Sequence, residues 1–238
     1  MAVENSQTDG DLFKEIFNAF CGRHEVRTVR YDLRMGGGST LDVVVDQCLQ
    51  RQRITVAICD SDKAYPQASD SDLLSNMIRN ANRNNYIGYI NSLPCRDIEN
   101  IIPIDIIFDN RLRPDYNLLF QNILQRIHSD TSLNKTMDWP ILYFDMKRGI
   151  SLARLATLSP LSPEFTWTHE NFSLDGTNRL DRDFAGFGPA ILADFLSNAK
   201  AVSQLANRVR KREWHPKLEE LFDILCWYLA GERFQPAI

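Results

Sequence analysis

The sequence lacks the patterns of a disulfide framework, a zinc site or a histidine metal site. Its cysteines are odd in number, scattered and free of Cys-x-x-Cys spacing: Cys21, Cys48, Cys59, Cys95 and Cys226. We therefore expect buried thiols and no structural zinc or disulfides. The four histidines show no His-x-x-x-His spacing, so we interpret them as structural.

Long hydrophobic runs are also missing. No stretch approaches the roughly 18 uninterrupted apolar residues of a membrane span. The first residues, MAVENSQTDG, lack the basic and apolar regions of a signal peptide. With 44% hydrophobic residues among 238, the chain is long enough to bury a sizeable core. The sequence predicts a cytoplasmic globular protein that does not bind a membrane.

Positive charge is not in excess either. The 27 lysines and arginines are outnumbered by 31 acidic residues, which gives a net charge of −4. This balance argues against a protein that coats nucleic acid by bulk attraction, so any such binding must be local. Two basic groups are candidates, Arg111 with Arg113 and the run Arg208, Arg210, Lys211 and Arg212. An ordinary solvated helix face is the alternative interpretation of each group.

The first hundred residues alternate between helical and strand patterns. Helices are predicted at 9–21, at 41–49 after the glycine loop MGGGST, and at 69–84, with Thr8 or Asp9 and Ser69 or Asp70 as caps. Strands are predicted at 26–33, 54–59 and 86–93. The apolar run at 54–59 is typical of a strand buried on both faces of a parallel sheet. We therefore predict an α/β fold with a mainly parallel sheet flanked by helices and joined by right-handed crossovers.

The second half is predicted to be mostly helical. Helical patterns cover 113–129, 188–212 and 215–231, and one late strand is predicted at 139–145. The Ser-, Pro-, Asp- and Asn-rich stretch 158–186 is predicted to be a long loop or insertion. We thus divide the chain into an α/β domain, 1–110, and a mostly helical extension, 111–238.

An acidic pair follows the buried strand directly. Asp60 and Asp62 are separated by Ser61, at the end of a parallel strand where ligands of open α/β sheets bind. Mg²⁺ prefers carboxylate oxygens and keeps several waters, so a few acids suffice when substrate phosphates complete its shell. Lys63 can pair with either acid or contact a phosphate. The alternative interpretation is a set of solvated charges at the start of a loop.

The order of these motifs resembles the Toprim domain. The resemblance rests on VENSQTDGDLFKEIF at 3–17, MGGGST at 35–40, ITVAICDSDK at 54–63 and CRDIENIIP at 95–103, and it covers roughly residues 3–105. Toprim domains occur in topoisomerases, primases, overcoming-lysogenization-defect nucleases and small anti-phage effectors. The segment RDIEN is similar to that of the last two groups. Among them, the chain most resembles the Toprim effector subunits that partner an ABC-type ATPase in the PARIS defence system.

The resemblance implies a Mg²⁺-dependent nuclease that cleaves DNA or a structured RNA such as tRNA. It assigns Glu4, Asp60, Asp62 and Lys63 to catalysis, and Glu4, Asp60, Asp62 and Glu99 to one or two Mg²⁺ ions, for which Mn²⁺ can substitute. It also implies an anti-phage toxin effector controlled by an ATPase partner. The oligomeric state, monomer or homodimer, stays open.

The chain departs from the family pattern near its start. Asn5 stands where the family usually has glycine, and only three residues precede Glu4. This departure motivates an alternative, a catalytically weak Toprim scaffold that acts through protein interaction. A third interpretation takes Asp60 and Asp62 as the nucleophile pair of an aspartate-based phosphatase. It is disfavoured because Lys63 and Ala64 replace the Thr or Val expected after the second aspartate.

Overall fold

The computed structural model describes residues 1–5, 7–23, 31–37, 40–83, 88–110, 112, 140–172 and 183–230. The chain forms two compact units. The sheet unit comprises Met1–Ser61, Asp70–Pro94 and Phe195–Ile238, and the insert unit comprises Asp62–Ser69 and Cys95–Asp194. The division therefore differs from two consecutive parts meeting at residue 110, because the last helices of the chain belong to the same unit as the first strands.

The sheet unit is built on four parallel strands, in the order β2-β1-β3-β4. They are β1 (Ala2–Val3), β2 (Arg34–Met35), β3 (Thr55–Cys59) and β4 (Gly88–Ser92). Every residue of β3 is buried, as its uninterrupted apolar sequence predicts. The α/β class, the parallel sheet and its flanking helices are thus confirmed.

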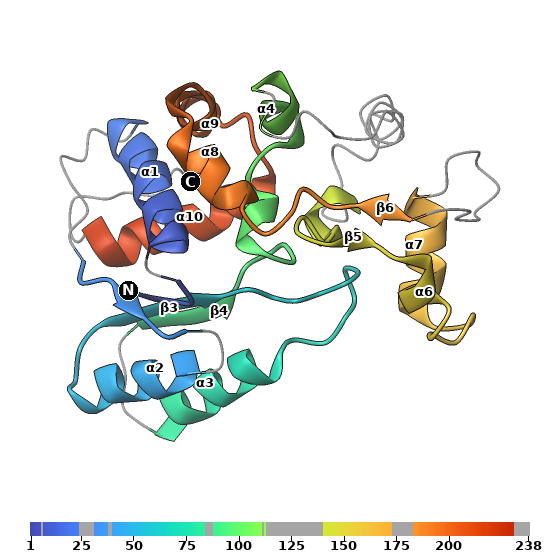
Figure 1. Ribbon diagram of the computed structural model, residues 1–238. Coiled ribbons are helices and arrows are strands. Elements are labelled where there is room, and N and C mark those ends of the chain that lie inside the picture. The colour runs from blue at the N-terminus through green and yellow to red at the C-terminus, as the bar shows by residue number, and fades with distance from the viewer. Residues whose placement is uncertain are drawn as a thin grey trace. The chain divides into compact units, whose positions relative to one another are not determined.

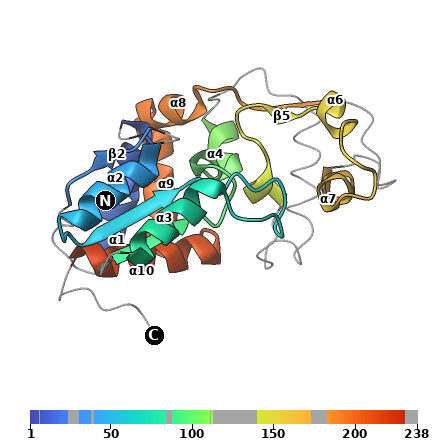
Figure 2. The same cartoon turned by 90° about the horizontal axis from the view of Figure 1, so that it is seen from below.

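Helices cover both faces of this sheet (Figures 1 and 2). On one face lie α2 (Leu41–Gln50) and α3 (Asp72–Arg83), and on the other lie α1 (Thr8–Arg23) and α10 (Pro216–Ala230). The strand order explains why α1 lies on the other face from α2 and α3. The connection from β1 to β2 runs across the sheet in the opposite direction to the connections from β2 to β3 and from β3 to β4, and right-handed connections in opposite directions place their helices on opposite faces. The predicted helices at 9–21, 41–49, 69–84 and 215–231 are confirmed within the described residues. The third begins later than predicted, at Asp72, and the Ser71 hydroxyl accepts from the amide of Leu74, so the prediction of Ser69 or Asp70 as its cap was wrong.

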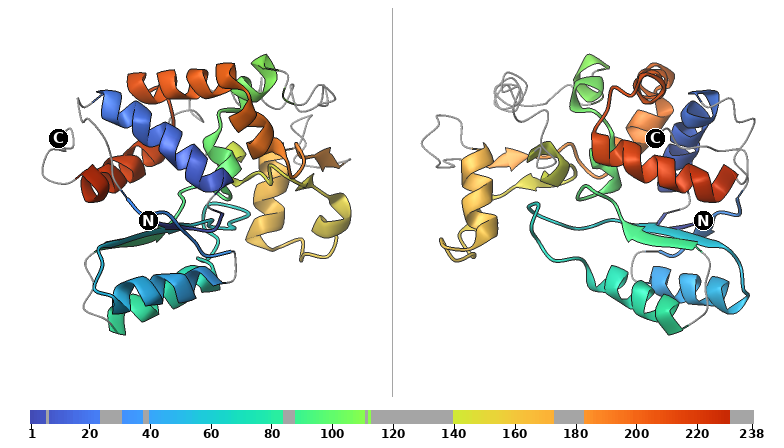
Figure 3. Two further views of the ribbon diagram at one scale, coloured as in Figure 1. Left: turned by 60° about the vertical axis from the view of Figure 1, so that its left-hand side comes forward. Right: turned by 180° about the vertical axis from the view of Figure 1, so that it is seen from behind.

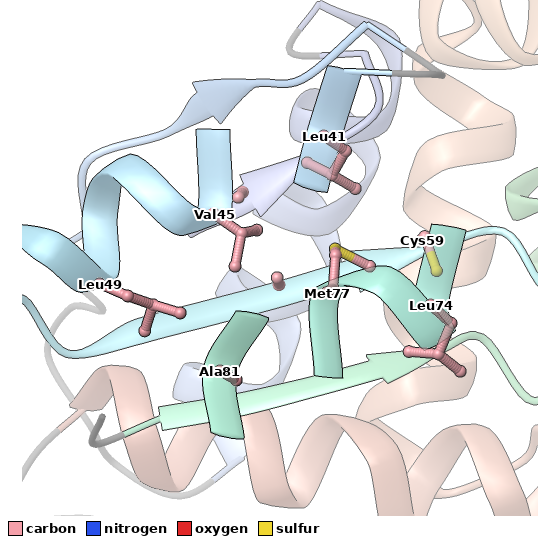
Figure 4. Close-up of a cluster of buried hydrophobic side chains, with 9 residues drawn as sticks. Leu41, Val45, Leu49, Cys59, Leu74, Met77 and Ala81 are labelled. Atoms are coloured by element: carbon pink, nitrogen blue, oxygen red, sulfur yellow. The ribbon is translucent and has the colours of Figure 1, made fainter. Parts of the chain in front are cut away.

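A buried apolar cluster joins α2, α3 and the sheet (Figure 4). Its side chains come from the inward faces of both helices and from β1 and β3: Ala2, Leu41, Val45, Leu49, Ala57, Cys59, Leu74, Met77 and Ala81. The spacing of three or four residues along each helix explains why these positions share one face.

The helices α1 and α10 pack together on the opposite face of the sheet (Figure 3). Aromatic side chains form a cluster where they meet. Phe222 of α10 is fully buried, and its ring centroid lies 5.3–5.9 Å from those of four other aromatic residues: Phe13, Phe17, Phe20 and Trp214. The helix α9 (Ala199–Lys211) also packs on α1. Helices more than 170 residues apart along the chain therefore share one core.

The insert unit is made of short elements. They are the 3-10 helices η2 (Ile98–Ile101) and η4 (Pro140–Tyr143), α4 (Ile104–Asp109), α6 (Leu152–Leu155), α7 (Pro163–Phe172), and the antiparallel strands β5 (Gly149–Ile150) and β6 (Phe184–Ala185). The helix α8 (Ile191–Ser197) begins in the insert unit and ends in the sheet unit. No helix in the described ranges has the length and apolar character needed to cross a bilayer.

Several sequence predictions for the second half were wrong. The stretch predicted as a strand at 139–145 contains η4. The Asn100 side chain donates to two of its carbonyls, and the carbonyl of Leu142 accepts from the amide of Arg96, which lies in no strand. The stretch 158–186, predicted to be a long loop or insertion, contains α7 and β6 and so is not a loop throughout, although it does lie within the insert unit. The single helix predicted at 188–212 is interrupted at Asn198, whose side chain accepts bonds from the amides of Lys200 and Ala201 and caps α9.

Other predictions fall outside the described residues or on elements that are shifted along the chain. The helix predicted at 113–129 and most of the strand predicted at 26–33 lie outside the described residues, as do Arg111 and Arg113; β2 follows at Arg34–Met35. Four of the five cysteines are buried as expected, and Cys48 is half-buried.

Candidate functional site

Glu4 and Asp60 meet at the carboxyl edge of the sheet. Glu4 follows β1, Asp60 follows β3, and these parallel strands are neighbours with Ala2 opposite Ala57. The backbone N–H of Asp60 donates to Oε1 of Glu4 over 3.1 Å. Both residues are half-buried. The two acids are 56 positions apart in the sequence, and the sheet brings them together.

The strand before Glu4 is short but lies inside the sheet. Ala2 and Val3 are each 1% exposed, and β1 pairs with β2 on one side and with β3 on the other. Beyond the strand, the amides of Gly36 and Gly37 donate to the carbonyls of Val3 and Glu4, both over 2.9 Å. The backbone of Glu4 is therefore held by a neighbouring segment despite its position near the start of the chain.

Steric and hydrogen-bonding demands explain the glycines at 36 and 37. A Cβ on Gly36 would lie 2.3 Å from the Cα of Leu41, and Gly37 has a φ of +56°, where a side chain is disfavoured. Their N–H groups are engaged by β1, so a phosphate cradle built on these two amides is not available. The two glycines therefore form a tight turn that holds the segment after β1.

Asn5 caps the helix that follows Glu4. Its Oδ1 accepts from the amides of Gln7 and Thr8, and its own amide donates to Oδ2 of Asp9 over 2.9 Å. Asparagine is among the residues best suited to this role. The prediction of Thr8 or Asp9 as the cap was therefore wrong. The capping role also explains why asparagine stands at position 5, where Toprim domains usually have glycine. Asn5 lies between β1, which ends at Val3, and α1, which begins at Thr8.

Asp62 and Lys63 belong to the insert unit, whereas Asp60 belongs to the sheet unit. Asp62 is exposed and has a left-handed backbone with a φ of 55°, a conformation that aspartate accepts more readily than most residues. Its amide donates to the carbonyl of Arg96 over 3.0 Å. Lys63 is half-exposed. The RDIEN segment therefore fixes the backbone of Asp62 within the insert unit.

Glu99 is deeply buried and already paired with a cation. Its side chain is 5% exposed, and Oε1 lies 3.1 Å from Nζ of Lys147. Its second oxygen, Oε2, has no hydrogen-bond partner among the described protein atoms. A buried carboxylate requires such a counter-charge, so the ammonium group of Lys147 compensates Glu99 in this structure.

Two other residues of RDIEN, Arg96 and Asn100, connect this segment to residues 141–148 of the insert unit. Asn100 accepts from the amide of Asp97 and donates to the carbonyls of Ile141 and Phe144. The guanidinium group of Arg96 lies 3.2 Å from Asp145, whose other oxygen accepts from the amides of Lys147 and Arg148. Sequence reasoning missed Asp145 and Lys147, because Asp145 ends a stretch predicted as a strand, Lys147 follows it, and neither carries a recognisable spacing.

Burial raises the pKa of Asp97 from 3.8 to about 6, although the Arg96 guanidinium group and the Lys147 ammonium group act in the opposite direction. A raised folded-state pKa destabilises the fold as the pH rises from about 4 to about 6, and the full penalty persists above that range. We expect Asp97→Asn to raise the free energy of unfolding at pH 7.5 by about 1–3 kcal/mol and to change it little at pH 4.

Urea denaturation of both proteins at the two pH values measures this effect. Asp109→Asn, which removes an exposed acid at the end of α4, serves as the control and should leave the pH dependence as it is in the wild type. An equal loss of stability in Asp97→Asn at both pH values would contradict the prediction.

The donor set at the sheet edge fits magnesium in type and number. Glu4 and Asp60 provide two carboxylates, and Mg²⁺ commonly uses one or two carboxylates with substrate phosphates and water. Across the residues that the structure describes, no group of three or more His, Cys, Asp or Glu side chains is arranged to hold a metal. A site made by this unit's described residues would therefore depend on the substrate to complete the shell.

The basic run ends α9 in the sheet unit. Arg208, Arg210 and Lys211 lie in the last turn of the helix, and Arg212 follows with a φ of 58°. Arg212 lies 3.4 Å from Glu219 of α10. Arg210 and Lys211 are exposed, as the interpretation as a solvated helix face predicts.

Searches against protein-family models, curated proteins and solved structures find no match for this chain.

Proposed function

We propose that this protein is a Toprim-type, Mg²⁺-dependent nuclease whose metal site is built around Glu4 and Asp60. One observation carries the proposal. The Glu4 carboxylate accepts the amide of Asp60, which brings together the two acids that the Toprim resemblance assigns to the metal. Their place at the carboxyl edge of a parallel sheet is where open α/β folds bind ligands.

Each acid has a role that follows from its setting. One oxygen of Glu4 is held by a backbone amide, which orients the carboxylate toward the loop after β3. Asp60 is attached to the end of a fully buried strand, so its backbone is rigid. Both groups are half-buried, so their negative charge is less screened than that of surface acids. Such a pair favours a hard divalent cation over a monovalent one.

Magnesium would supply the activation of a water molecule and the stabilisation of negative charge on a phosphodiester. In this proposal Glu4 and Asp60 bind and orient the ion, and Glu4 is also the candidate proton acceptor. Roles for Asp62, Lys63 and Glu99, and control by an ABC-type ATPase in anti-phage defence, rest on the resemblance of the sequence and stay predictions.

The experiment is a cleavage assay with purified protein on supercoiled plasmid, linear duplex, single-stranded DNA and tRNA. We expect cleavage of at least one substrate with Mg²⁺ or Mn²⁺ and none with EDTA. The pattern of cleaved substrates then distinguishes a DNA nuclease from an RNA nuclease. Intact substrates in every metal condition, with correctly folded protein, would contradict the proposal and favour the interaction scaffold.

A further inference from the structure

A cavity lies at the opposite end of the strands from Glu4 and Asp60. It has a volume of about 290 Å³ and is lined by the residues that begin β1, β2 and β3, including Ala2, Arg34 and Thr55. The five residues of β3 span roughly 16 Å, at about 3.3 Å each. The cavity is therefore separate from the candidate metal site within the same unit.

The side chains that line this cavity carry more positive than negative charge. Arg34 and Arg53 contribute two guanidinium groups, and Asp32 contributes one carboxylate. A single oxygen, Oδ2 of Asp32, serves both cations, at 3.8 Å from Arg34 and 3.1 Å from Arg53. All three side chains are about half-exposed or more, so this pairing is weak. Each guanidinium group carries five N–H donors, most of which this contact does not use.

The remaining lining is largely apolar and aromatic. Tyr31 and Tyr228 contribute rings and hydroxyl groups, while Ile54, Val56 and Leu229 contribute hydrocarbon surface. Burial raises the pKa of Tyr31, with a smaller effect from Asp11, so its hydroxyl stays protonated and able to donate at neutral pH. The lining thus combines two arginine side chains with several apolar and aromatic residues.

We propose that this cavity binds a small phosphorylated ligand with an aromatic ring, of the size and chemistry of a nucleoside monophosphate. A phosphate group offers several oxygens to the two guanidinium groups, whereas Asp32 offers them a single carboxylate oxygen. The volume of about 290 Å³ is close to the roughly 300 Å³ at which small-molecule pockets begin, which suits a ligand of about one nucleotide. Binding here requires no metal.

Calorimetric titration with AMP, GMP, CMP and UMP in the presence of EDTA tests the proposal on the full chain. At least one nucleotide should bind more tightly than its nucleoside and more tightly than inorganic phosphate, by about tenfold or more. Arg53→Ala should weaken that binding about tenfold or more, since it removes charge-assisted hydrogen bonds to the phosphate. Asp32→Asn should tighten binding several-fold, because it removes the competing carboxylate.

Two matched variants control for general charge effects. Arg51→Ala removes an exposed arginine two positions from Arg53 but outside the cavity, and Asp42→Asn removes an acid on α2 that does not line it. Both should bind within about twofold of the wild type. The proposal is overturned if no nucleotide binds, if inorganic phosphate binds as tightly as the nucleotides, or if Arg51→Ala weakens binding as much as Arg53→Ala. Because the measurement excludes metal, its outcome is independent of the nuclease proposal.

Discussion

Glu4→Gln and Asp60→Asn are each expected to lower the rate of Mg²⁺-dependent cleavage by about 100-fold or more. Both changes remove a negative charge from the pair proposed to bind the ion, and a group that also transfers a proton contributes about 100- to 10,000-fold. Glutamine at position 4 still offers an oxygen to the amide of Asp60, so the local hydrogen bond can be kept. The loss should therefore come from charge and not from unfolding.

The assay compares initial cleavage rates at saturating Mg²⁺, with melting temperatures measured on the same samples. Asp72→Asn removes an exposed acid from the first turn of α3 in the same unit and should retain nearly full activity. Direct titration with Mn²⁺ adds a second measurement, because the two site variants should bind the ion more weakly than Asp72→Asn does. Wild-type rates and metal affinity in Glu4→Gln would remove that residue from the proposed site.

Phe222→Ala should lower the free energy of unfolding of the sheet unit by about 3–5 kcal/mol. Phe222 is 0% exposed and contacts three phenylalanines of α1, so truncation leaves a cavity that rigid neighbours cannot fill. The loss is a large fraction of the stability of a typical domain. Chemical denaturation followed by circular dichroism measures it.

Trp227→Ala provides the matched control on the same helix. Trp227 is larger than Phe222 but 52% exposed, and it lies on the outer side of α10. Its replacement should cost less than about 1 kcal/mol, in keeping with surface positions. Equal losses in the two variants would show that α10 is not packed as the structure has it.

The helices and strands of the first hundred residues could be predicted because their patterns are local. The apolar run at 54–59 and the helical spacing in 41–49 each have one structure that buries them well. The prediction at 139–145 was wrong because that segment is apolar without a decisive period. Its conformation is set by Asn100, about 40 residues earlier in the chain, which binds two of its carbonyls.

Some residues of the candidate site could likewise be predicted from the sequence, and others could not. Asp60 could be placed at a strand end from the sequence, because an uninterrupted apolar run ends there in acids. The capping role of Asn5 could have been found from its short polar side chain just before a helical pattern. The burial of Glu99 against Lys147 had no local signal, because the two residues are far apart in sequence and charged side chains usually lie at the surface.

The sequence by itself determined the class of the fold, the parallel core strand and the presence of acids where that strand ends, since periodicity and breakers act within a few residues. Only the tertiary structure decided that Glu4 contacts Asp60, that α10 joins α1 in one aromatic core, and that two arginines share one aspartate at the far end of the sheet. Apart from Asp32 and Arg34, which are two positions apart, these pairings join residues that are distant along the chain. Their energies depend on which surfaces are buried together, which no local pattern records.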